Sequence, residues 1–296
     1  MKKPVKNIAA SILAQLKNQT EILERPFAET LQYYVMERFL YRLSKTKYAS
    51  KFILKGGLLL YVWGIPLRRP TRDIDLRGYV TNNSESLLGI FNDVTKVSAP
   101  EDGIIFDPDS ITIEETQIDA DYQGVRIKLT AHLGNSRIPI QIDIGFSDEL
   151  ASNAESVEYP NILSDLKQTR MKGYPKEAVV AEKFHAMVRH AELNSRMKDY
   201  YDLWLISKTF EFDPKSLQKA IETTFKKRDS ELPTERPAAL TVEFASMNQI
   251  RWRNFLEKSH LKNNESDDFA NILEKIWNFL QPPLQSSIDK SKTNRK

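Results

Sequence analysis

The sequence predicts an α+β fold in which helices come first, strands follow, and the second half is helical. Apolar residues recur at helical spacing through the first 50 residues, β-rich runs dominate about 70–145, and helical spacing returns after Ser147. At 296 residues the chain can bury a sizeable core, as one large domain or two smaller ones. The change in pattern places the boundary between the two halves near 150–170.

Two helices are expected to open the chain. The first runs from Pro4 to about Glu24, and the second from about Pro26 to Ser44, where Pro26 occupies a first turn that tolerates proline. Both have apolar residues one turn apart, namely Ile8, Ile12, Leu13 and Leu16 in the first and Leu31, Val35, Phe39 and Leu43 in the second.

A glycine turn follows these helices. The short apolar segment 52–54 leads to Gly56-Gly57, and an apolar run over 58–63 ends at Gly64 and Pro66. The backbone of a glycine pair can approach a ligand closely because no Cβ stands in the way.

Strands are expected to dominate the next part of the chain. Asp73 to Val80 is the first, and a helix over 82–92 follows it. Two β-rich runs, 111–118 and 125–133, are joined by a turn and predict a hairpin. Residues 138–144 alternate strictly, with four isoleucines on one face and Gln141 and Asp143 on the other.

Helices are expected again in the second half. Tyr174-Pro175 introduces one that reaches about Leu193, and another runs from Arg196 to Lys208. The remainder to about Leu280 has helical character with loops at 233–237. Pro282-Pro283 is expected to end the ordered chain, which leaves 286–296 as a disordered basic tail.

Composition excludes several classes of site. The chain has no cysteine and four histidines, so disulfides, thiol catalysis and thiolate zinc sites are ruled out. The net charge of +3 does not by itself demand a nucleic-acid partner, and the basic first 55 residues are more typical of a solvated helix face. Because no apolar run approaches the roughly 20 residues that a membrane span needs, we expect a cytoplasmic protein without a membrane partner.

The carboxylates of Asp73 and Asp75 are the first candidate for chemistry. A spacing of two places both on one face of a strand, while Ile74 and Leu76 point into the core. Magnesium prefers oxygen ligands, commonly one or two carboxylates completed by phosphates and water. The alternative is a solvent-facing strand with ion pairs such as Asp73–Arg72. The nearby glycine turn and arginines favour a nucleoside triphosphate with a divalent metal.

Asp143 is the second candidate. It lies between isoleucines in mid-strand, where an unpaired buried carboxylate is costly. If its strand lies beside that of Asp73 and Asp75, three carboxylates meet in one place, as in a two-metal site. The alternative is a half-exposed strand on which Asp143 pairs with Arg126 or Arg137, and the sequence leaves both interpretations open.

Lys183 is the third candidate, because it falls inside the apolar arc of its predicted helix. Its ammonium either extends outward to solvent or reaches an anion in a cleft between the two halves of the chain. Asp199 and Asp202 share one face of the next helix and can complete such a site or orient Lys183. Alternatively, Asp199 pairs with Arg196 or Lys198.

Together these motifs resemble the AbiEii/AbiGii toxin family, which belongs to the DNA-polymerase-β-like nucleotidyltransferase superfamily and is related to MenT-type toxins. The similarity runs from about residue 30 to 205. The segments that establish it are Phe39-Leu40-Tyr41-Arg42-Leu43-Ser44, Leu54-Lys55-Gly56-Gly57-Leu58-Leu59, Arg69-x-Thr71-x-Asp73-Ile74-Asp75-Leu76, Asp143-Ile144-Gly145-Phe146, Ala181-Glu182-Lys183-Phe184 and 194–203.

The resemblance implies a polymerase-β-like core, a small mixed sheet with flanking helices, followed by a helical C-terminal domain. We expect N-terminal helices over 1–50, the nucleotidyltransferase core over 51–160, the helical domain over 161–285 and the tail over 286–296.

The resemblance also implies the site residues. Magnesium, with manganese as an alternative, would be held by Asp73, Asp75 and Asp143. Catalysis would also need Lys183 with Asp199 and Asp202. The nucleotide would contact Lys55, Gly56, Gly57, Arg69, Thr71 and Lys183. In one departure, Gly57-Leu58 stands where many family members have Gly-Gly-Thr, so the turn offers no hydroxyl.

The function expected is Mg²⁺-dependent transfer of a nucleotide from an NTP to a hydroxyl, with release of pyrophosphate. The resemblance implies an RNA acceptor, in particular the tRNA 3′ end, and a toxin with a cognate antitoxin in a toxin–antitoxin or phage-defence system. The alternative is a catalytically weakened binding or regulatory protein of the same fold. A sugar transferase using Asp-x-Asp is disfavoured because strand–helix alternation is missing before Asp73.

Overall fold

The protein divides into two compact units, Met1–Tyr174 and Pro175–Lys296. The computed structural model describes residues 7–65, 70–119, 122–146, 154–261 and 266–293. The first unit is mixed α and β and the second is helical, which confirms the predicted α+β class. The finer predicted boundaries at residues 50 and 160 stay a prediction.

A mixed sheet forms the centre of the first unit. Its described strands follow the spatial order β3-β4-β5-β2-β1-β7-β6. Most neighbouring pairs are antiparallel, but β2 runs parallel to β5 and β1 runs parallel to β7. The bounds are β1 Phe52–Lys55, β2 Asp73–Gly78, β3 Ile104–Asp119, β4 Tyr122–Leu133, β5 Ser136–Phe146, β6 Glu155–Tyr159 and β7 Thr169–Gly173.

The alternation of side chains along β2 and β5 fixes which face of each strand is buried. Ile74 and Leu76 on β2 are fully buried, and the isoleucines of β5 are buried beside them. The predicted strands and hairpin are present. The sequence did not predict β6 and β7, which lie after 145 where we expected no strands. Their sequences, Glu-Ser-Val-Glu-Tyr and Thr-Arg-Met-Lys-Gly, contain few apolar side chains, so the alternating signal is weak.

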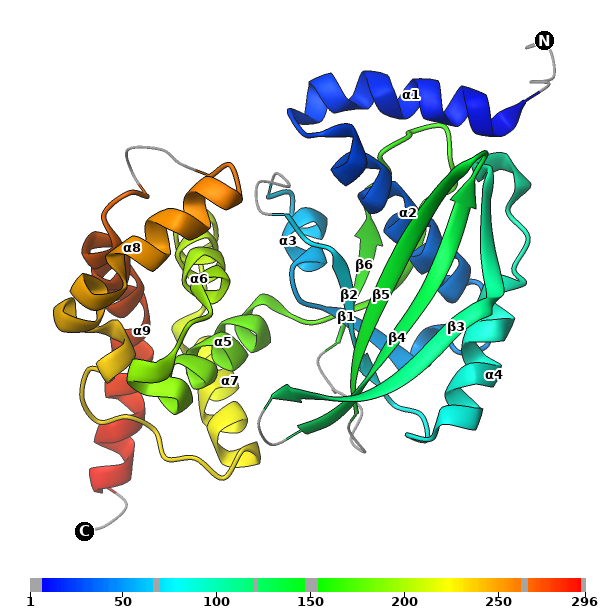
Figure 1. Ribbon diagram of the computed structural model, residues 1–296. Helices are drawn as coiled ribbons and strands as arrows, with labels where there is room; N and C mark the ends of the chain where they lie inside the picture. The colour runs from blue at the N-terminus through cyan, green and yellow to red at the C-terminus, as the bar shows by residue number, and fades with distance from the viewer. Residues whose placement is uncertain (1–6, 66–69, 120–121, 147–153, 262–265, 294–296) are drawn as a thin grey trace. The chain divides into compact units, whose positions relative to one another are not determined.

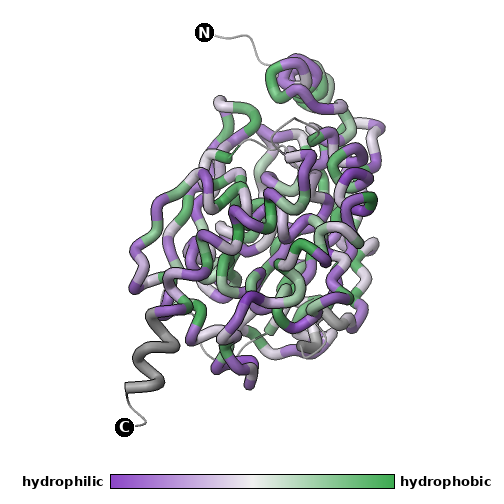
Figure 2. The backbone as a smooth tube through the Cα atoms, turned by 90° about the vertical axis from the view of Figure 1, so that its left-hand side faces the viewer, coloured by the Kyte–Doolittle hydropathy of each residue, from purple (hydrophilic) through white to green (hydrophobic). Residues whose placement is uncertain are grey.

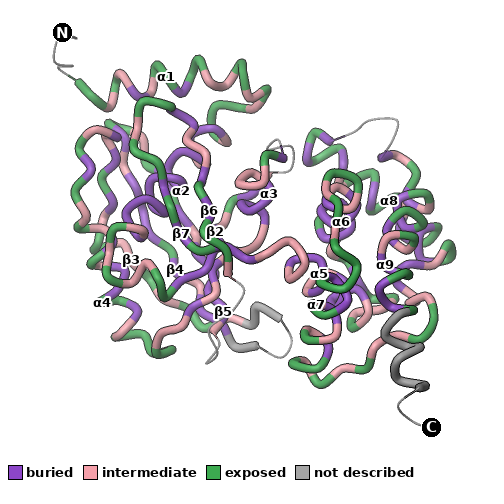
Figure 3. The backbone as a smooth tube through the Cα atoms, turned by 180° about the vertical axis from the view of Figure 1, so that it is seen from behind, coloured by how far each residue is buried: buried purple, intermediate pink, exposed green. Residues whose placement is uncertain are grey.

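Helices cover the sheet. Helix α2 packs against β5, β7 and α4, α4 packs against β3, and α1 packs on α2 (Figure 1). Figure 3 shows that α2 is buried along most of its length, and its side chains are buried almost without interruption from Thr30 to Leu43. The bounds are α1 Ile8–Leu23, α2 Phe27–Ser44, α3 Leu58–Val62 and α4 Ser84–Thr95, with short 3₁₀ turns η1 Ala49–Lys51 and η2 Pro100–Asp102.

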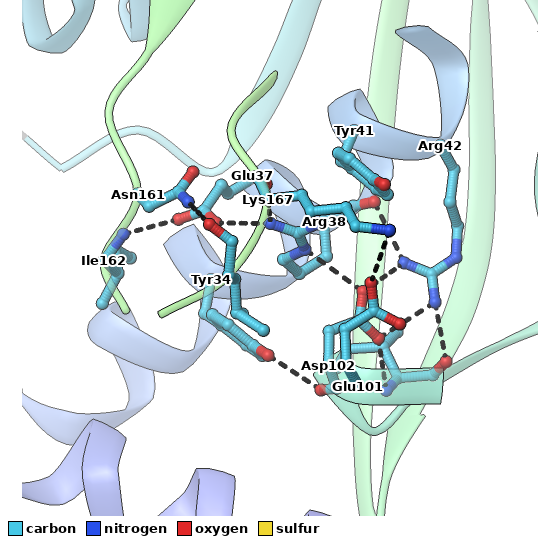
Figure 4. Close-up of polar contacts among 12 residues, drawn as sticks. Tyr34, Glu37, Arg38, Tyr41, Arg42, Glu101, Asp102, Asn161, Ile162 and Lys167 are labelled. Carbon is cyan, nitrogen blue, oxygen red and sulfur yellow. Dashed lines mark hydrogen bonds and ion pairs between the residues drawn. The ribbon is translucent and has the colours of Figure 1, made fainter. Parts of the chain in front are cut away.

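Helix α2 carries buried charges that are compensated by a neighbouring turn (Figure 4). Arg42 donates two hydrogen bonds to the Asp102 carboxylate, at 2.6 and 3.0 Å, and Arg38 Nε donates a third at 3.1 Å. All three side chains are almost completely buried. The phenol of Tyr34 donates to the Asp102 carbonyl at 2.8 Å. Asp102 therefore ties η2 to α2 through charge-assisted hydrogen bonds.

Glu37 completes this buried cluster from the other side of Arg38. Its carboxylate accepts a hydrogen bond from Arg38 at 3.1 Å and another from the backbone N–H of Ile162 at 2.7 Å. Burial raises the pKa of Glu37 to about 7, although the hydrogen bond from Ile162 and the charge of Arg38 act in the opposite direction. The cluster thus connects α2 to the segment between β6 and β7.

The second unit consists of helices in its described part. Its long helices are α5 Lys176–His190, α6 Met197–Thr209, α7 Pro214–Lys227, α8 Val242–Lys258 and α9 Phe269–Thr293, with 3₁₀ turns η3 Ala191–Leu193 and η4 Ala238–Leu240. An aromatic cluster fills its core, in which the Trp252 ring stacks on Phe269 with centroids 4.7 Å apart. Trp252 Nε1 donates to the carbonyl of Ser266 at 2.6 Å, so the buried indole is satisfied.

The C-terminal helix differs from the sequence prediction. We expected Pro282-Pro283 to end the ordered chain and 286–296 to be disordered, but α9 continues through both prolines to Thr293. Leu280 before the prolines and Leu284 after them are both buried. The apolar stripe therefore continues across the prolines, and packing outweighs the loss of their N–H donors.

Polar and apolar residues are interspersed along the chain (Figure 2). Among the helices of the described residues, none has the length and hydropathy to cross a membrane.

The buried cluster predicts a large difference between two adjacent acidic residues. Asp102→Asn should lower the free energy of unfolding by about 3–5 kcal/mol, because Arg38 and Arg42 lose their carboxylate while buried. Glu101→Gln removes the same charge from a residue whose side chain is 38% exposed. This variant should change the free energy of unfolding by no more than about 0.5 kcal/mol. Urea denaturation measures both. Equal losses in the two variants would contradict this role for Asp102.

Candidate functional site

The parallel pairing of β2 with β5 brings three carboxylates together. Asp75 lies directly opposite Asp143, and Asp73 lies opposite Gln141. One carboxylate oxygen from each of Asp73, Asp75 and Asp143 lies within 4.8 Å of the others. Asp143 is buried, whereas Asp73 and Asp75 are half-buried. An unbalanced cluster of like charges this close is unfavourable, so it is suited to a cation.

Arg126 on β4 already compensates part of this charge. Its Nε and one terminal nitrogen donate to the two oxygens of Asp143 at 2.8 and 2.9 Å. The Gln141 amide also reaches both oxygens, at 3.4 and 3.2 Å. The sequence left two interpretations of Asp143 open, an ion pair with an arginine or membership of a carboxylate cluster. The structure contains both.

The glycine turn is shaped by contact with Asp75. Gly56 follows β1 and has a φ of +70°, which residues with a side chain rarely adopt. A Cβ atom at this position would overlap the Asp75 carboxylate. Gly56 is therefore required both by the backbone conformation and by the close approach of Asp75. Gly57 adopts an ordinary helical φ of −65° at the start of α3.

Lys55, Thr71 and Arg69 are the other residues of the first unit that we predicted to contact the nucleotide. Lys55 lies opposite Asp75 in the sheet register, and its ammonium is 5.5 Å from the centre of the Tyr174 ring. Thr71 is buried, and its backbone N–H donates to the phenol of Tyr33 at 2.8 Å. Arg69 lies outside the described residues.

Lys183, Asp199 and Asp202 meet in the second unit. Lys183 projects from α5, and its ammonium donates to Asp199 at 2.7 Å and to Asp202 at 2.9 Å on α6. All three side chains are largely buried. Arg196 also pairs with Asp199, at 2.8 Å. Both predicted alternatives for Asp199, pairing with Arg196 and orienting Lys183, are thus present.

The charges around Asp199 have a clear effect on its ionisation. Burial alone would raise the pKa of Asp199, but the positive charges of Lys183 and Arg196 outweigh burial and hold that pKa below its ordinary value. Asp199 therefore stays ionised at neutral pH and keeps the Lys183 side chain in place. The prediction that this cluster and the three carboxylates serve one site stays a prediction.

The sequence did not indicate two contacts near the candidate site, that of the Tyr33 phenol with Thr71 and that of the Gln141 amide with Asp143. It offered Arg126 as one of two alternative arginine partners for Asp143. Arg126 and Asp143 are 17 residues apart. Only the register of the β4–β5 hairpin places them opposite each other.

Comparison with known proteins identifies the family. A model of the nucleotidyl transferase AbiEii toxin family, of the type IV toxin–antitoxin system, matches residues 38–275. The chain belongs to this family. The AbiEii match covers most of the chain and includes the Asp73–Asp75–Asp143 and Lys183–Asp199–Asp202 clusters. The protein is therefore a nucleotidyltransferase. The resemblance inferred from the sequence motifs is thereby confirmed.

Two solved structures from Helicobacter pylori are similar in fold. One is a candidate nucleotidyltransferase with 15% identity and a TM-score of 0.49, covering 87% of this chain and 95% of that one. The other, JHP933, has 16% identity and a TM-score of 0.49, covering 90% and 95%. No curated protein matches the chain by sequence.

The donor set of Asp73, Asp75 and Asp143 fits a divalent cation. All three ligands are carboxylate oxygens, which suit hard cations such as Mg²⁺ and Mn²⁺. With no cysteine in the chain and no histidine in this cluster, the set is unlike a structural zinc site.

Two glycines allow the Asp75 contact to be tested. Gly56→Ala and Gly64→Ala both place a side chain at positive φ, at +70° and +77°. A Cβ at Gly64 would meet only open space. Gly64→Ala should therefore lower the free energy of unfolding only by the cost of the backbone conformation, about 1–2 kcal/mol. Gly56→Ala should lose clearly more free energy of unfolding and should also impair nucleotide transfer, because Asp75 must move. Equal effects of the two substitutions on stability and transfer would contradict the proposed fit.

Proposed function

We propose that the protein transfers a nucleoside monophosphate from an NTP to a hydroxyl acceptor and releases pyrophosphate, with Mg²⁺ as the cofactor and Mn²⁺ as an alternative. The observation that supports this most directly is the group of three carboxylates on β2 and β5, in a chain of the AbiEii family. A bound divalent cation supplies charge neutralisation of the triphosphate and activation of the attacking hydroxyl.

The residues of the first unit would hold the metal and the triphosphate. Asp73, Asp75 and Asp143 are the proposed metal ligands. Gly56 and Gly57 would let the backbone approach the phosphates closely, and Lys55 would add a positive charge at the end of β1. Arg69 and Thr71 are proposed as further triphosphate contacts, although the Thr71 backbone N–H is already used by Tyr33.

Lys183 is the proposed cation of the second unit. Negative charge on the triphosphate must be offset as the bond to the leaving pyrophosphate breaks, which is a common electrostatic task in such transfers. Asp199 and Asp202 orient the ammonium at 2.7 and 2.9 Å. We propose that they hold Lys183 ready for the nucleotide.

The acceptor we propose is RNA, in particular the 3′ end of tRNA, where an added nucleotide would block aminoacylation. This proposal is supported by the membership of the chain in the AbiEii family, a family of type IV toxins. The same family supports a cognate antitoxin as partner and a role in toxin–antitoxin or phage-defence systems in the cytoplasm.

One observation favours a second candidate, a catalytically weakened protein that binds nucleotide for regulation. The turn reads Gly57-Leu58 and offers no hydroxyl to the triphosphate. Against it, the three carboxylates and the Lys183 cluster are present. The first proposal therefore has the stronger support.

Labelling experiments distinguish the two candidates. The full chain is incubated with labelled NTPs, Mg²⁺ and total RNA. Wild type should label RNA, and Asp75→Asn and Lys183→Ala should each slow labelling by about 100-fold or more, because each removes a charge required in the transfer. Glu114→Gln, which changes an exposed carboxylate on β3, should label at the wild-type rate.

Two outcomes would contradict parts of the proposal. If wild type labels nothing while a thermal-shift assay shows Mg²⁺–NTP binding, the regulatory candidate is favoured over the enzyme. If wild type and the Asp75→Asn and Lys183→Ala variants label RNA equally, the roles proposed for Asp75 and Lys183 are wrong.

A further inference from the structure

A row of charged residues crosses four adjacent strands of the sheet. Arg126 on β4 lies opposite Asp143 on β5, Asp143 opposite Asp75 on β2, and Asp75 opposite Lys55 on β1. Residues directly opposite each other in neighbouring strands share a face of the sheet. Two cationic residues therefore flank the two carboxylates in the register, and Arg126 donates hydrogen bonds to the carboxylate of Asp143.

Arg126 reaches the Asp143 carboxylate with two of its nitrogens, at 2.8 and 2.9 Å. The Arg126 side chain is 36% exposed, whereas that of Asp143 is only 11% exposed. The cationic group reaches the buried carboxylate from the more open side.

Orientation of Asp143 does not depend on Arg126 alone. The Gln141 amide donates to both Asp143 oxygens, at 3.4 and 3.2 Å. An ionised carboxylate has about four lone-pair positions, and Arg126 and Gln141 together approach all of them. A metal ion at Asp143 would therefore replace the longer contacts, those of Gln141. What Arg126 supplies, and Gln141 cannot, is a positive charge beside the cluster.

We propose that Arg126 is a built-in counter-cation that lowers the affinity of the Asp73–Asp75–Asp143 site for a divalent metal. In the metal-free protein it compensates the buried Asp143 carboxylate, and with metal bound it repels the ion. The affinity for metal alone is then kept weak, and the metal binds firmly only with further negative ligands such as a triphosphate. Arg126 is thus a positioning and charge-setting residue rather than a catalytic one. This inference rests on the metal site of the proposed function.

Metal titration of the full chain tests the inference without relying on activity. Mn²⁺ is titrated into wild type, Arg126→Gln and Arg126→Lys, with binding followed by calorimetry. Arg126→Gln should bind Mn²⁺ at least about tenfold more tightly than wild type, because the repelling charge is gone. Arg126→Lys keeps the charge and should bind within about threefold of wild type.

A matched control lies two residues further along β4. Lys128 pairs with Glu114 at 2.8 Å, and both side chains are about half exposed. Lys128→Gln removes the same unit of charge from the same strand at a solvated position. It should leave Mn²⁺ affinity within about twofold of wild type, because water screens exposed charges.

Each outcome decides the inference. Unchanged or weaker Mn²⁺ binding by folded Arg126→Gln overturns it, because Arg126 would then only orient Asp143. If Arg126→Gln does not fold, Arg126→Lys decides, since a clear loss of affinity in that variant also overturns it. Should neither wild type nor Arg126→Gln bind Mn²⁺, the metal site of the proposed function fails as well. If Arg126→Gln binds Mn²⁺ and wild type does not, the inference is supported most strongly.

Discussion

The parallel pairing of β2 with β5 is the constraint on which the candidate site depends. Because Asp75 lies opposite Asp143, a slip of one residue would turn one of these carboxylates to the other face of the sheet. The register is fixed by burial, since Ile74 and Leu76 on β2 and the isoleucines of β5 pack on the core face. The core thus determines the position of the carboxylates, and its stability is the condition for their function.

At three places among the described residues a buried carboxylate is compensated by nearby cations. Asp102 is held by Arg38 and Arg42, Asp199 by Lys183 and Arg196, and Asp143 by Arg126. The first of these arrangements joins secondary-structure elements and the second orients a lysine. The Asp143 pair differs because its carboxylate also belongs to a cluster that fits a divalent cation. There the compensating charge affects binding as well as stability.

Local patterns were sufficient to predict the α+β class, the hairpin at 111–133 and the shared face of Asp73 and Asp75, because alternation and spacing act over a few residues. They left the position of Asp143 open, because that depends on which strand β5 pairs with. They did not predict β7, whose parallel partner β1 lies more than 100 residues away, or the contact of Arg38 with Asp102, which are 64 residues apart. Nor did they predict that His185 is buried against Phe225 and hydrogen-bonded to Ser230. Long-range packing decides such cases.

If β2 and β5 together form a divalent-metal site, manganese should bind there. Crystals of the full chain grown with Mn²⁺ and a non-hydrolysable NTP analogue would reveal its position through the anomalous scattering of manganese. We expect a strong anomalous peak within coordination distance, about 2.0–2.4 Å, of oxygens from Asp73, Asp75 and Asp143. A manganese peak elsewhere, with these three carboxylates bound only to protein groups and water, would contradict it.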